Sequence, residues 1–299
     1  MTELIQYLVA GVAIGALYAL IALGFVIIYK ATGVINLAQG GLLLLGTYFT
    51  YGFRRELGLP FFLALTLAML ACAVVALGLE RLVLARMVGR PVFSVIMVTI
   101  GLAIVIDQVV TWKWGFDRLD LADPWGLATF RVGGVIVATT DVARIVAAAI
   151  TLAGFFALFR WSRLGVVMRA TASDQEAALA QGISPRLVFG LSWAVAAAIA
   201  TLAGVLLSAG ARGADPSLST VAFLALPAVI LGGIDSPGGA VVGGVVVGVV
   251  EELTKGYGPV HLPGWVGDNP HIVLPYLVLV AVLLIRPHGL FGTKEVERL

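Results

Sequence analysis

Long, uninterrupted apolar runs constrain this chain more than any other feature of its sequence. The first run extends from about Leu4 to Tyr29, and several later runs reach or approach the ~18–20 apolar residues that a helix needs to cross a bilayer. Only 12% of the residues are charged, about half the fraction found in soluble domains. Because lipid cannot satisfy backbone polar groups, such runs must be helical. The sequence therefore predicts an all-α, polytopic membrane bundle.

We expect about 8 transmembrane helices, with a range of 7–9, in a single membrane domain that covers residues 1–299. The apolar segments extend over about 4–29, 36–52, 61–84, 92–112, 144–161, 187–209, 218–233, 240–254 and 272–285. Segments 36–52 and 218–233 are short and interrupted by glycine, so each either crosses fully or re-enters. No internal repeat is evident in the sequence, although an inverted structural repeat would not require one.

Basic residues in the connections predict the orientation in the membrane, because short cytoplasmic loops are enriched in Lys and Arg. Three clusters fall on one side if all the segments cross, and we expect that side to be cytoplasmic, with the N-terminus outside. Arg54 and Arg55 would lie outside, against this trend. An external loop is expected over about 113–143, with a turn or small hairpin at its Gly133–Gly134 pair. The clusters are Arg81, Arg86 and Arg90; Arg160, Arg163, Arg169 and Arg186; and Arg286, Lys294 and Arg298.

A polar stretch within the expected cytoplasmic loop, about 162–186, predicts a short isolated helix. Ser173 can cap this helix, and Glu176 three residues later completes a capping box. Gly182 follows the last helical residue, and Pro185 prevents continuation. A helix of about two turns is marginal alone. We therefore expect it to dock against a cytoplasmic partner.

Several classes of function are excluded by motifs that the sequence lacks. No Gly-x-x-x-x-Gly-Lys-[Ser/Thr] occurs, so the chain has no P-loop of its own for ATP. No basic patch with interleaved aromatic residues indicates nucleic acid. The single cysteine, Cys72, can form no internal disulfide, and no Cys/His cluster indicates a metal site. We expect neither catalytic residues nor a bound cofactor.

Polar residues and glycines inside the apolar segments are the candidates for a transport path, because polar groups at membrane depth are costly unless they are paired or face water. The alternative to a path residue is a helix cap for Asn36 and an interhelical hydrogen bond for Gln39. Glu251 is either a transport residue or half of a structural pair, whereas Asp107 is expected to be structural. The stretch 232–239 either breaks a helix within the membrane or forms a tight cytoplasmic turn. The path candidates are Asn36, Gln39, Gly40, Gly41, Thr99, Gly232, Gly233 and Glu251.

The polar stretch resembles the Glu-Ala-Ala-x-x-x-Gly loop of bacterial ABC importer permeases. It stands here as Glu176-Ala177-Ala178-Leu-Ala-Gln-Gly182, without the Ile-x-Leu-Pro element that follows in that family. The wider chain resembles the LivH-type permeases of branched-chain amino acid ABC importers. The likeness is densest at Gly15-Ala-Leu-Tyr18, Val34-Ile35-Asn36-Leu-Ala38-Gln39-Gly40-Gly41, Val98-Thr99-Ile-Gly101, and Leu231-Gly232-Gly233-Ile-Asp-Ser236-Pro237-Gly238-Gly239.

The resemblance implies a transmembrane permease subunit in the inner membrane, not an enzyme, for branched-chain or related hydrophobic amino acids. It implies that Glu176, Ala177, Ala178 and Gly182 belong to a coupling helix that follows two cytoplasmic ATPases, which use ATP and magnesium. It also implies a periplasmic binding protein and a second permease, LivM-like or another copy. Family members often have His at Gln39 and an acidic residue at Gly41, so the cargo stays open. The alternatives are another small cargo (urea, an amide or an aromatic acid) or a stand-alone channel or secondary transporter.

Overall fold

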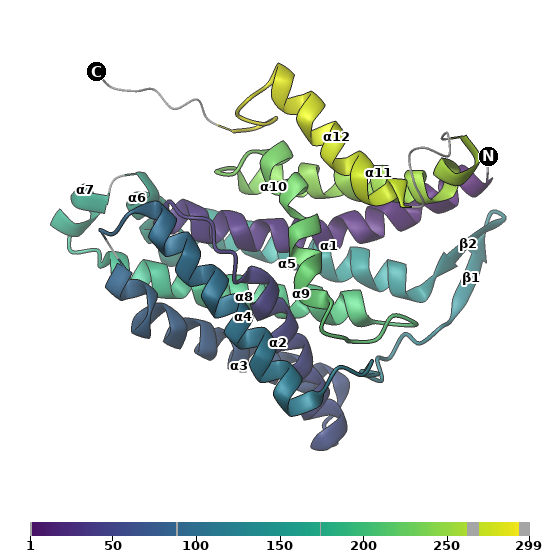
Figure 1. Cartoon of the computed structure of the whole chain (residues 1–299), viewed down its shortest axis with the longest axis horizontal. Helices are drawn as coiled ribbons and strands as arrows, with labels where there is room; N and C mark the ends of the chain where they lie inside the picture. The colour runs from purple at the N-terminus through teal and green to yellow at the C-terminus, as the bar shows by residue number, and fades with distance from the viewer. Residues whose placement is uncertain (1, 88, 174, 262–268, 293–299) are drawn as a thin grey trace.

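The computed structural model describes residues 2–87, 89–173, 175–261 and 269–292. Its architecture is a helical bundle with one small hairpin (Figure 1), which confirms the expected all-α fold. Within these residues, 6 helices are long and apolar enough to cross a membrane. They are α1 (Thr2–Thr32), α3 (Phe61–Leu82), α4 (Val92–Trp114), α5 (Thr139–Trp161), α8 (Pro185–Ser208) and α11 (Pro237–His261).

Shorter elements account for the remaining apolar segments and connections. Segment 36–52 forms α2 (Gln39–Tyr51), which continues as a turn of π-helix (Gly52–Glu56). Segment 218–233 forms two helices, α9 (Leu218–Leu224) and α10 (Leu226–Gly232), and the last segment forms α12 (Pro270–Ile285). The polar connections hold a 3-10 turn (Leu84–Met87), α6 (Arg163–Ser173), α7 (Gln175–Ala180), β1 (Thr129–Val132) and β2 (Val135–Ala138).

The bundle has two ends, which we call the basic end and the hairpin end. At the basic end, Lys30 near the close of α1 donates a hydrogen bond of 3.0 Å to the Asp235 carbonyl, just before α11. At the hairpin end, Gln6 near the start of α1 donates one of 3.3 Å to the Ile136 carbonyl in β2. The described members of the three basic clusters all lie in elements or connections at the basic end, whereas Lys294 and Arg298 fall outside the described residues.

The expected hairpin is present in the stretch 113–143. Strands β1 and β2 pair antiparallel, from Thr129 opposite Ala138 to Val132 opposite Val135. Gly133 and Gly134 form the connection with φ values of 56° and 87°. Two consecutive positive φ values are typical of a type I′ turn, whose twist matches the strands.

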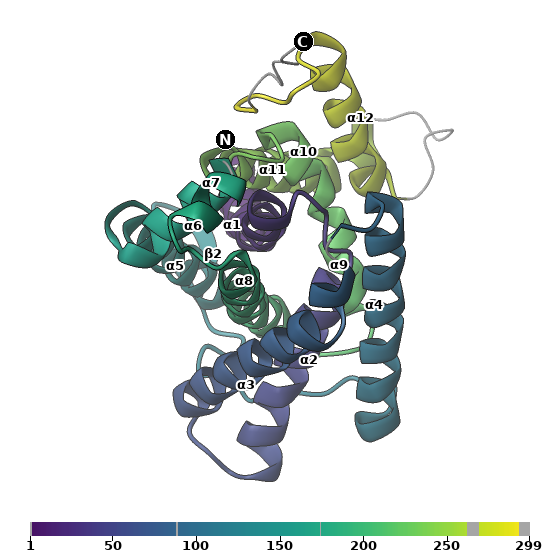
Figure 2. The ribbon, with the colours of Figure 1, turned by 90° about the vertical axis from the view of Figure 1, so that its left-hand side faces the viewer.

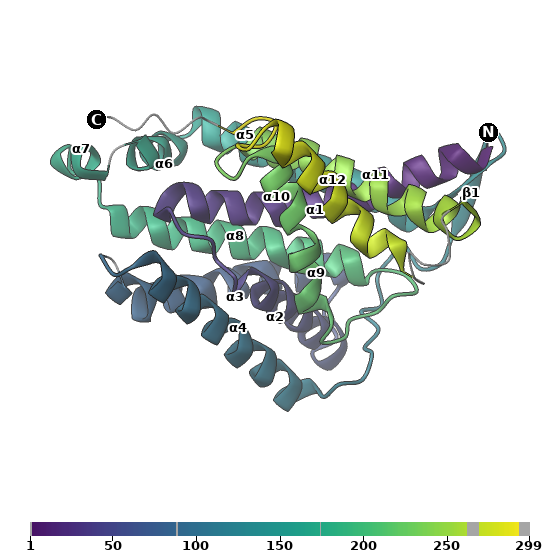
Figure 3. The same ribbon diagram turned by 45° about the horizontal axis from the view of Figure 1, so that its top comes forward.

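The two halves of the bundle repeat one pattern in opposite directions. In the first half, α1 runs toward the basic end, α2 returns, α3 runs to the basic end and α4 returns. In the second half, α8 runs toward the hairpin end, α9 and α10 return, α11 follows α8 and α12 returns (Figures 1 and 3). In each half a short helix, α2 or α9, is preceded by non-helical chain, at 33–38 and at 209–217. This arrangement is an inverted repeat, which the sequence alone did not reveal.

Helices α1 and α8 form the centre of the bundle, where their residues are mostly buried. Figure 2, viewed from the basic end, shows the other long helices arranged around them. Glycine allows the closest approaches: a Cβ at Gly15 of α1 would lie 2.8 Å from the Gly244 carbonyl oxygen of α11. Such contacts are typical of helix packing in membranes, where small residues let backbones meet.

Candidate functional site

The path candidates Asn36 and Thr99 meet where the chain is non-helical before α2. Asn36 is almost fully buried, and its Oδ1 atom accepts a hydrogen bond of 3.0 Å from the backbone N–H of Ala38. Thr99 on α4 accepts one of 3.2 Å from the backbone N–H of Leu37. Backbone that leaves a helix inside a membrane needs such partners. These two side chains therefore help to hold the break.

Gln39 lies between the two central helices. Its amide Nε2 donates a long hydrogen bond of 3.4 Å to the Ala196 carbonyl on α8. A Cβ at Gly24 of α1 would lie only 2.1 Å from the same nitrogen, so this glycine makes room for the side chain. Gln39 therefore makes an interhelical hydrogen bond between α2 and α8. Its Oε1 atom has no hydrogen-bond partner among the described residues.

Gly40 and Gly41 bring α2 against two other helices. A Cβ at Gly40 would lie 2.1 Å from the Ser219 carbonyl oxygen of α9, and one at Gly41 would lie 3.3 Å from Cβ of Ile106 on α4. The Ser219 hydroxyl in turn donates a hydrogen bond of 3.1 Å to the Asp107 carboxylate. The short helices of the two halves thus meet at Gly40. Interrupted segments at corresponding positions of two repeats are a pointer to a binding site in transporters.

A cavity of about 200 Å³ lies beside this break, toward the basic end. Asn36 and Thr99 line it together with Glu80 of α3 and Arg90 of the α3–α4 connection. Glu80 is almost fully buried and was not among the candidates predicted from the sequence. The sequence signal for Glu80 was a carboxylate about one turn inside the apolar segment 61–84. The adjacent Arg81, however, is typical of the end of a transmembrane segment.

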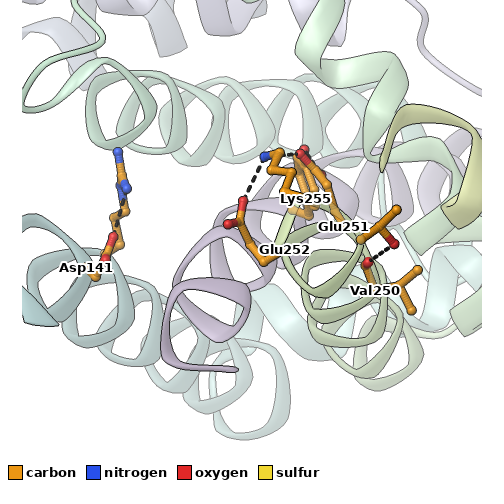
Figure 4. Close-up of polar contacts among 8 residues, drawn as sticks. Asp141, Val250, Glu251, Glu252 and Lys255 are labelled. Atoms are coloured by element: carbon orange, nitrogen blue, oxygen red, sulfur yellow. Dashed lines mark hydrogen bonds and ion pairs between the residues drawn. The ribbon is translucent and has the colours of Figure 1, made fainter. Parts of the chain in front are cut away.

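Glu251 lies elsewhere, in the second half of α11, and Figure 4 shows its contact with Lys255. Its carboxylate accepts a hydrogen bond of 2.6 Å from the Tyr18 hydroxyl of α1 and forms an ion pair of 2.7 Å with Lys255 one turn on. Lys255 also pairs with Glu252 at 2.7 Å. The cation that pairs with Glu251 is thus on the same helix.

Gly232 and Gly233 lie in a tight turn at the basic end and do not line the cavity beside Asn36. Gly233 ends α10 with a φ of 105°, a value that favours glycine. The backbone N–H groups of Leu290 and Phe291 donate to the Leu231 and Gly232 carbonyls at 2.8 and 3.0 Å, so the segment after α12 covers this turn. This stretch is thus a tight turn between α10 and α11.

In the described part of the polar stretch, α6 ends at Ser173 and α7 begins at Gln175. The end of α7 matches the expected stop signal. Gly182 has a φ of 79°, and the N–H groups of Ile183 and Gly182 donate to the Ala178 and Leu179 carbonyls at 3.0 and 2.9 Å. This bonding pattern is a Schellman motif.

Helix α7 protrudes beyond the start of α8 at the basic end (Figure 3). Ala178 is buried, whereas Leu179 is 62% exposed. An apolar side chain in this position is available for contact with another protein. The side chains of Ser173 and Glu176, on which the expected capping box depends, lie outside the described part of the chain, as does Asp174.

Comparison with known proteins places these observations in a family. The family described as "Branched-chain amino acid transport system / permease component" matches residues 7–285. The chain is 28% identical to the high-affinity branched-chain amino acid transport system permease protein LivH of Salmonella typhimurium, over 98% of this chain and 97% of that protein. It is 29% identical to the corresponding permease BraD of Pseudomonas aeruginosa, with the same coverage. It is 26% identical to a probable LivH of Methanocaldococcus jannaschii, over 95% and 91%. No solved structure matches.

Proposed function

Because this chain belongs to the branched-chain amino acid transport permease family, we propose that it is the transmembrane subunit of an ABC importer for branched-chain or related hydrophobic amino acids. Family membership makes it a multi-pass membrane permease, a transport component rather than an enzyme. The match along nearly the whole chain carries the proposal. The cargo comes from what the relatives' names say of those proteins.

The energy for transport is supplied by two cytoplasmic ATPase subunits that bind ATP and magnesium. Helix α7 is the contact that follows them, since it protrudes from the bundle and exposes Leu179. The Schellman motif at Gly182 fixes the end of α7, so a push on α7 is passed to α8, which begins at Pro185. Glu176, Ala177, Ala178 and Gly182 remain the proposed coupling residues.

The basic end faces the cytoplasm of the inner membrane, so the N-terminus lies outside. The support is the gathering of Arg81, Arg86, Arg90 and the loop arginines at that end, which the positive-inside rule assigns to the cytoplasm. The hairpin end then faces a periplasmic binding protein. A second permease, LivM-like or a second copy of this chain, completes the path.

Transport proceeds by alternating access. Closure of the ATPases on ATP drives α6, α7 and α8, and the spans tilt against each other. ATP can shift the equilibrium between the two access states by no more than the difference in its binding free energy to those states. The candidates Asn36, Gln39, Gly40, Gly41 and Thr99 lie where the two short helices meet, and this junction is where we place the path within this chain.

The decisive experiment is isolation of the tagged chain from its native membranes in mild detergent, with stoichiometric partners identified by mass spectrometry. Near-equimolar P-loop ATPases, with or without a second permease, support the importer. Recovery of the chain alone, or only with copies of itself, contradicts it and favours a channel or secondary transporter. Uptake of L-leucine, urea and an aromatic acid by the reconstituted complex then identifies the cargo.

A further inference from the structure

The cavity at the basic end is built mainly from apolar side chains of several helices. Ile28 of α1, Leu84 after α3, and Phe189 and Trp193 of α8 contribute to its wall. Trp193 is almost fully buried, so the wall on that side is closed by the core of the bundle. The exposed connection after α3, with Gly89 and Arg90, borders the cavity on the basic end. The site is therefore an apolar recess that opens toward the proposed cytoplasmic side.

Two buried polar groups in the wall lack partners among the described residues. They are Nδ2 of Asn36 and Oε2 of Glu80, both beneath the surface of the wall. The Asn36 and Glu80 side chains are only 1% and 2% exposed. A buried polar group without a hydrogen bond is unfavourable, and a buried carboxyl group more so. A pair of them on one cavity indicates that something absent from the structure completes the site.

The unpartnered atoms define the chemistry of the missing group. Glu80 offers acceptor oxygens, which suit an ammonium group. Asn36 offers an amide donor and Arg90 a guanidinium, which suit a carboxylate. The apolar wall between them suits an aliphatic side chain. One small molecule that carries an ammonium, a carboxylate and an aliphatic group is a free aliphatic amino acid.

We propose that this cavity binds a free aliphatic amino acid, with its ammonium on Glu80 and its carboxylate on Asn36 and Arg90. The choice of an aliphatic amino acid rests on the proposed function, whereas the need for a ligand with both a donor and an acceptor rests on the unpartnered atoms. Contact with the ligand requires the Asn36 and Glu80 side chains to rotate, because their unpartnered atoms lie beneath the wall of the cavity. Because the recess opens at the basic end, a bound molecule is either imported cargo that is leaving the path for the cytoplasm or free amino acid that binds from the cytoplasm.

Binding is tested by isothermal titration calorimetry of L-leucine into the complex isolated with its partners, in nanodiscs and without ATP or binding protein. Two analogues separate the charges: 4-methylpentanoate lacks the ammonium, and 3-methylbutylamine lacks the carboxylate. The proposal expects saturable binding of L-leucine at millimolar or lower concentration and at least about tenfold weaker binding of either analogue. Absence of binding, or equal binding of an analogue, overturns it.

Isosteric variants assign the contacts. Glu80→Gln keeps the shape but removes the charge, and Asn36→Asp keeps the Oδ1 acceptor for Ala38 but removes the amide donor. Each is expected to weaken L-leucine binding by about tenfold or more. Glu3→Gln, at an exposed site on the hairpin end, is the matched control and is expected to bind as the unmodified complex does. Unchanged binding by Glu80→Gln contradicts the proposal.

A second measurement avoids any loss of folding in those variants. Met87 lines the cavity, and the single native cysteine, Cys72, is buried, so Met87→Cys supplies one reactive thiol in an otherwise intact site. L-Leucine is expected to slow its reaction with a maleimide, and 4-methylpentanoate is not. Equal rates with and without L-leucine overturn the proposal. ATP-driven uptake by the same complex tests the importer separately, so a complex that imports L-leucine without protecting Met87→Cys refutes only this site.

Discussion

The hydroxyl of Tyr18 on α1 donates a buried hydrogen bond of 2.6 Å to the carboxylate of Glu251 on α11, across 233 positions of sequence. The same carboxylate pairs with Lys255 at 2.7 Å. Glu251 therefore joins α1 of the first half to α11 of the second. An acidic residue inside an apolar span is by default a candidate transport residue, and here its partners also give it a structural role.

Glu251→Gln separates these two roles. The variant keeps an acceptor for Tyr18 but loses the charge, so we expect an assembled complex with a loss of stability of about 1 kcal/mol, the difference between a charged and a neutral acceptor, and altered uptake kinetics. Thermal unfolding in detergent and initial uptake rates are the two measurements. Glu252→Gln is the control, since Glu252 shares Lys255 but accepts no hydrogen bond from Tyr18 in the structure. Normal uptake by Glu251→Gln would assign Glu251 to structure alone.

Gly46 on α2 and Thr201 on α8 are packed so closely that alanine at position 46 is expected to destabilise the bundle. Its Cβ would lie 2.0 Å from the Thr201 hydroxyl oxygen and 2.6 Å from its Cβ. Overpacking of this kind costs about 1–3 kcal/mol. Thermal unfolding of Gly46→Ala checks it, and Gly78→Ala is the control because its Cβ would meet nothing within 4 Å. Thr201→Ala in the Gly46→Ala background should recover part of the loss, and no recovery would place the strain elsewhere.

Local signals in the sequence predicted the helical segments and their ends well. Gly182 predicted the end of α7 and Pro185 predicted the start of α8. These signals are local, because the positive φ of glycine and the missing N–H of proline are properties of single residues. The Gly133–Gly134 pair gave the hairpin for the same reason. The break between α9 and α10 was missed, although Pro227 lies just inside the start of α10. The apolar residues on both sides of that proline made the segment read as one helix.

Contacts between distant segments could not be predicted. The partner of Gln39 on α8 and the meeting of Gly40 with Ser219 depend on how the two halves pack, and the halves share no evident sequence. Glu80 was missed because its burial depends on Gly190 of α8, where a Cβ would lie 3.3 Å from Oε2 of Glu80. Asn36 and Thr99 were named as candidates for their polarity, and only the structure places them on one cavity with Glu80.

The orientation is open to direct test because the only native cysteine is buried. Leu179→Cys on α7 and Arg131→Cys on β1 place exposed thiols at opposite ends of the bundle. We expect a membrane-impermeant maleimide to label Leu179→Cys in inside-out vesicles and Arg131→Cys in right-side-out vesicles. The unmodified chain controls for background. The reverse pattern would invert the topology and remove α7 from the reach of cytoplasmic ATPases.

Gly182→Val tests whether the end of α7 transmits force. Gly182 has a φ of 79°, and a Cβ there would meet nothing within 4 Å, so the substitution acts through the backbone rather than through a clash. A residue other than glycine in the left-handed region loses about 1–2 kcal/mol, and valine can avoid this loss by unwinding the Schellman motif. We expect a folded complex at normal expression that hydrolyses ATP but imports several-fold less cargo per ATP.

The matched control for that variant is Gly58→Val at the hairpin end. Gly58 has a φ of 69° and equally open surroundings, so the backbone penalty is the same but lies far from α7. Uptake and ATP hydrolysis in proteoliposomes are measured for both variants at equal protein. Uncoupling in Gly182→Val alone supports transmission through α7. Import at the level of the unmodified chain by both variants would mean that the geometry at the end of α7 does not govern coupling. The same loss of import in both variants would attribute the effect to general backbone strain.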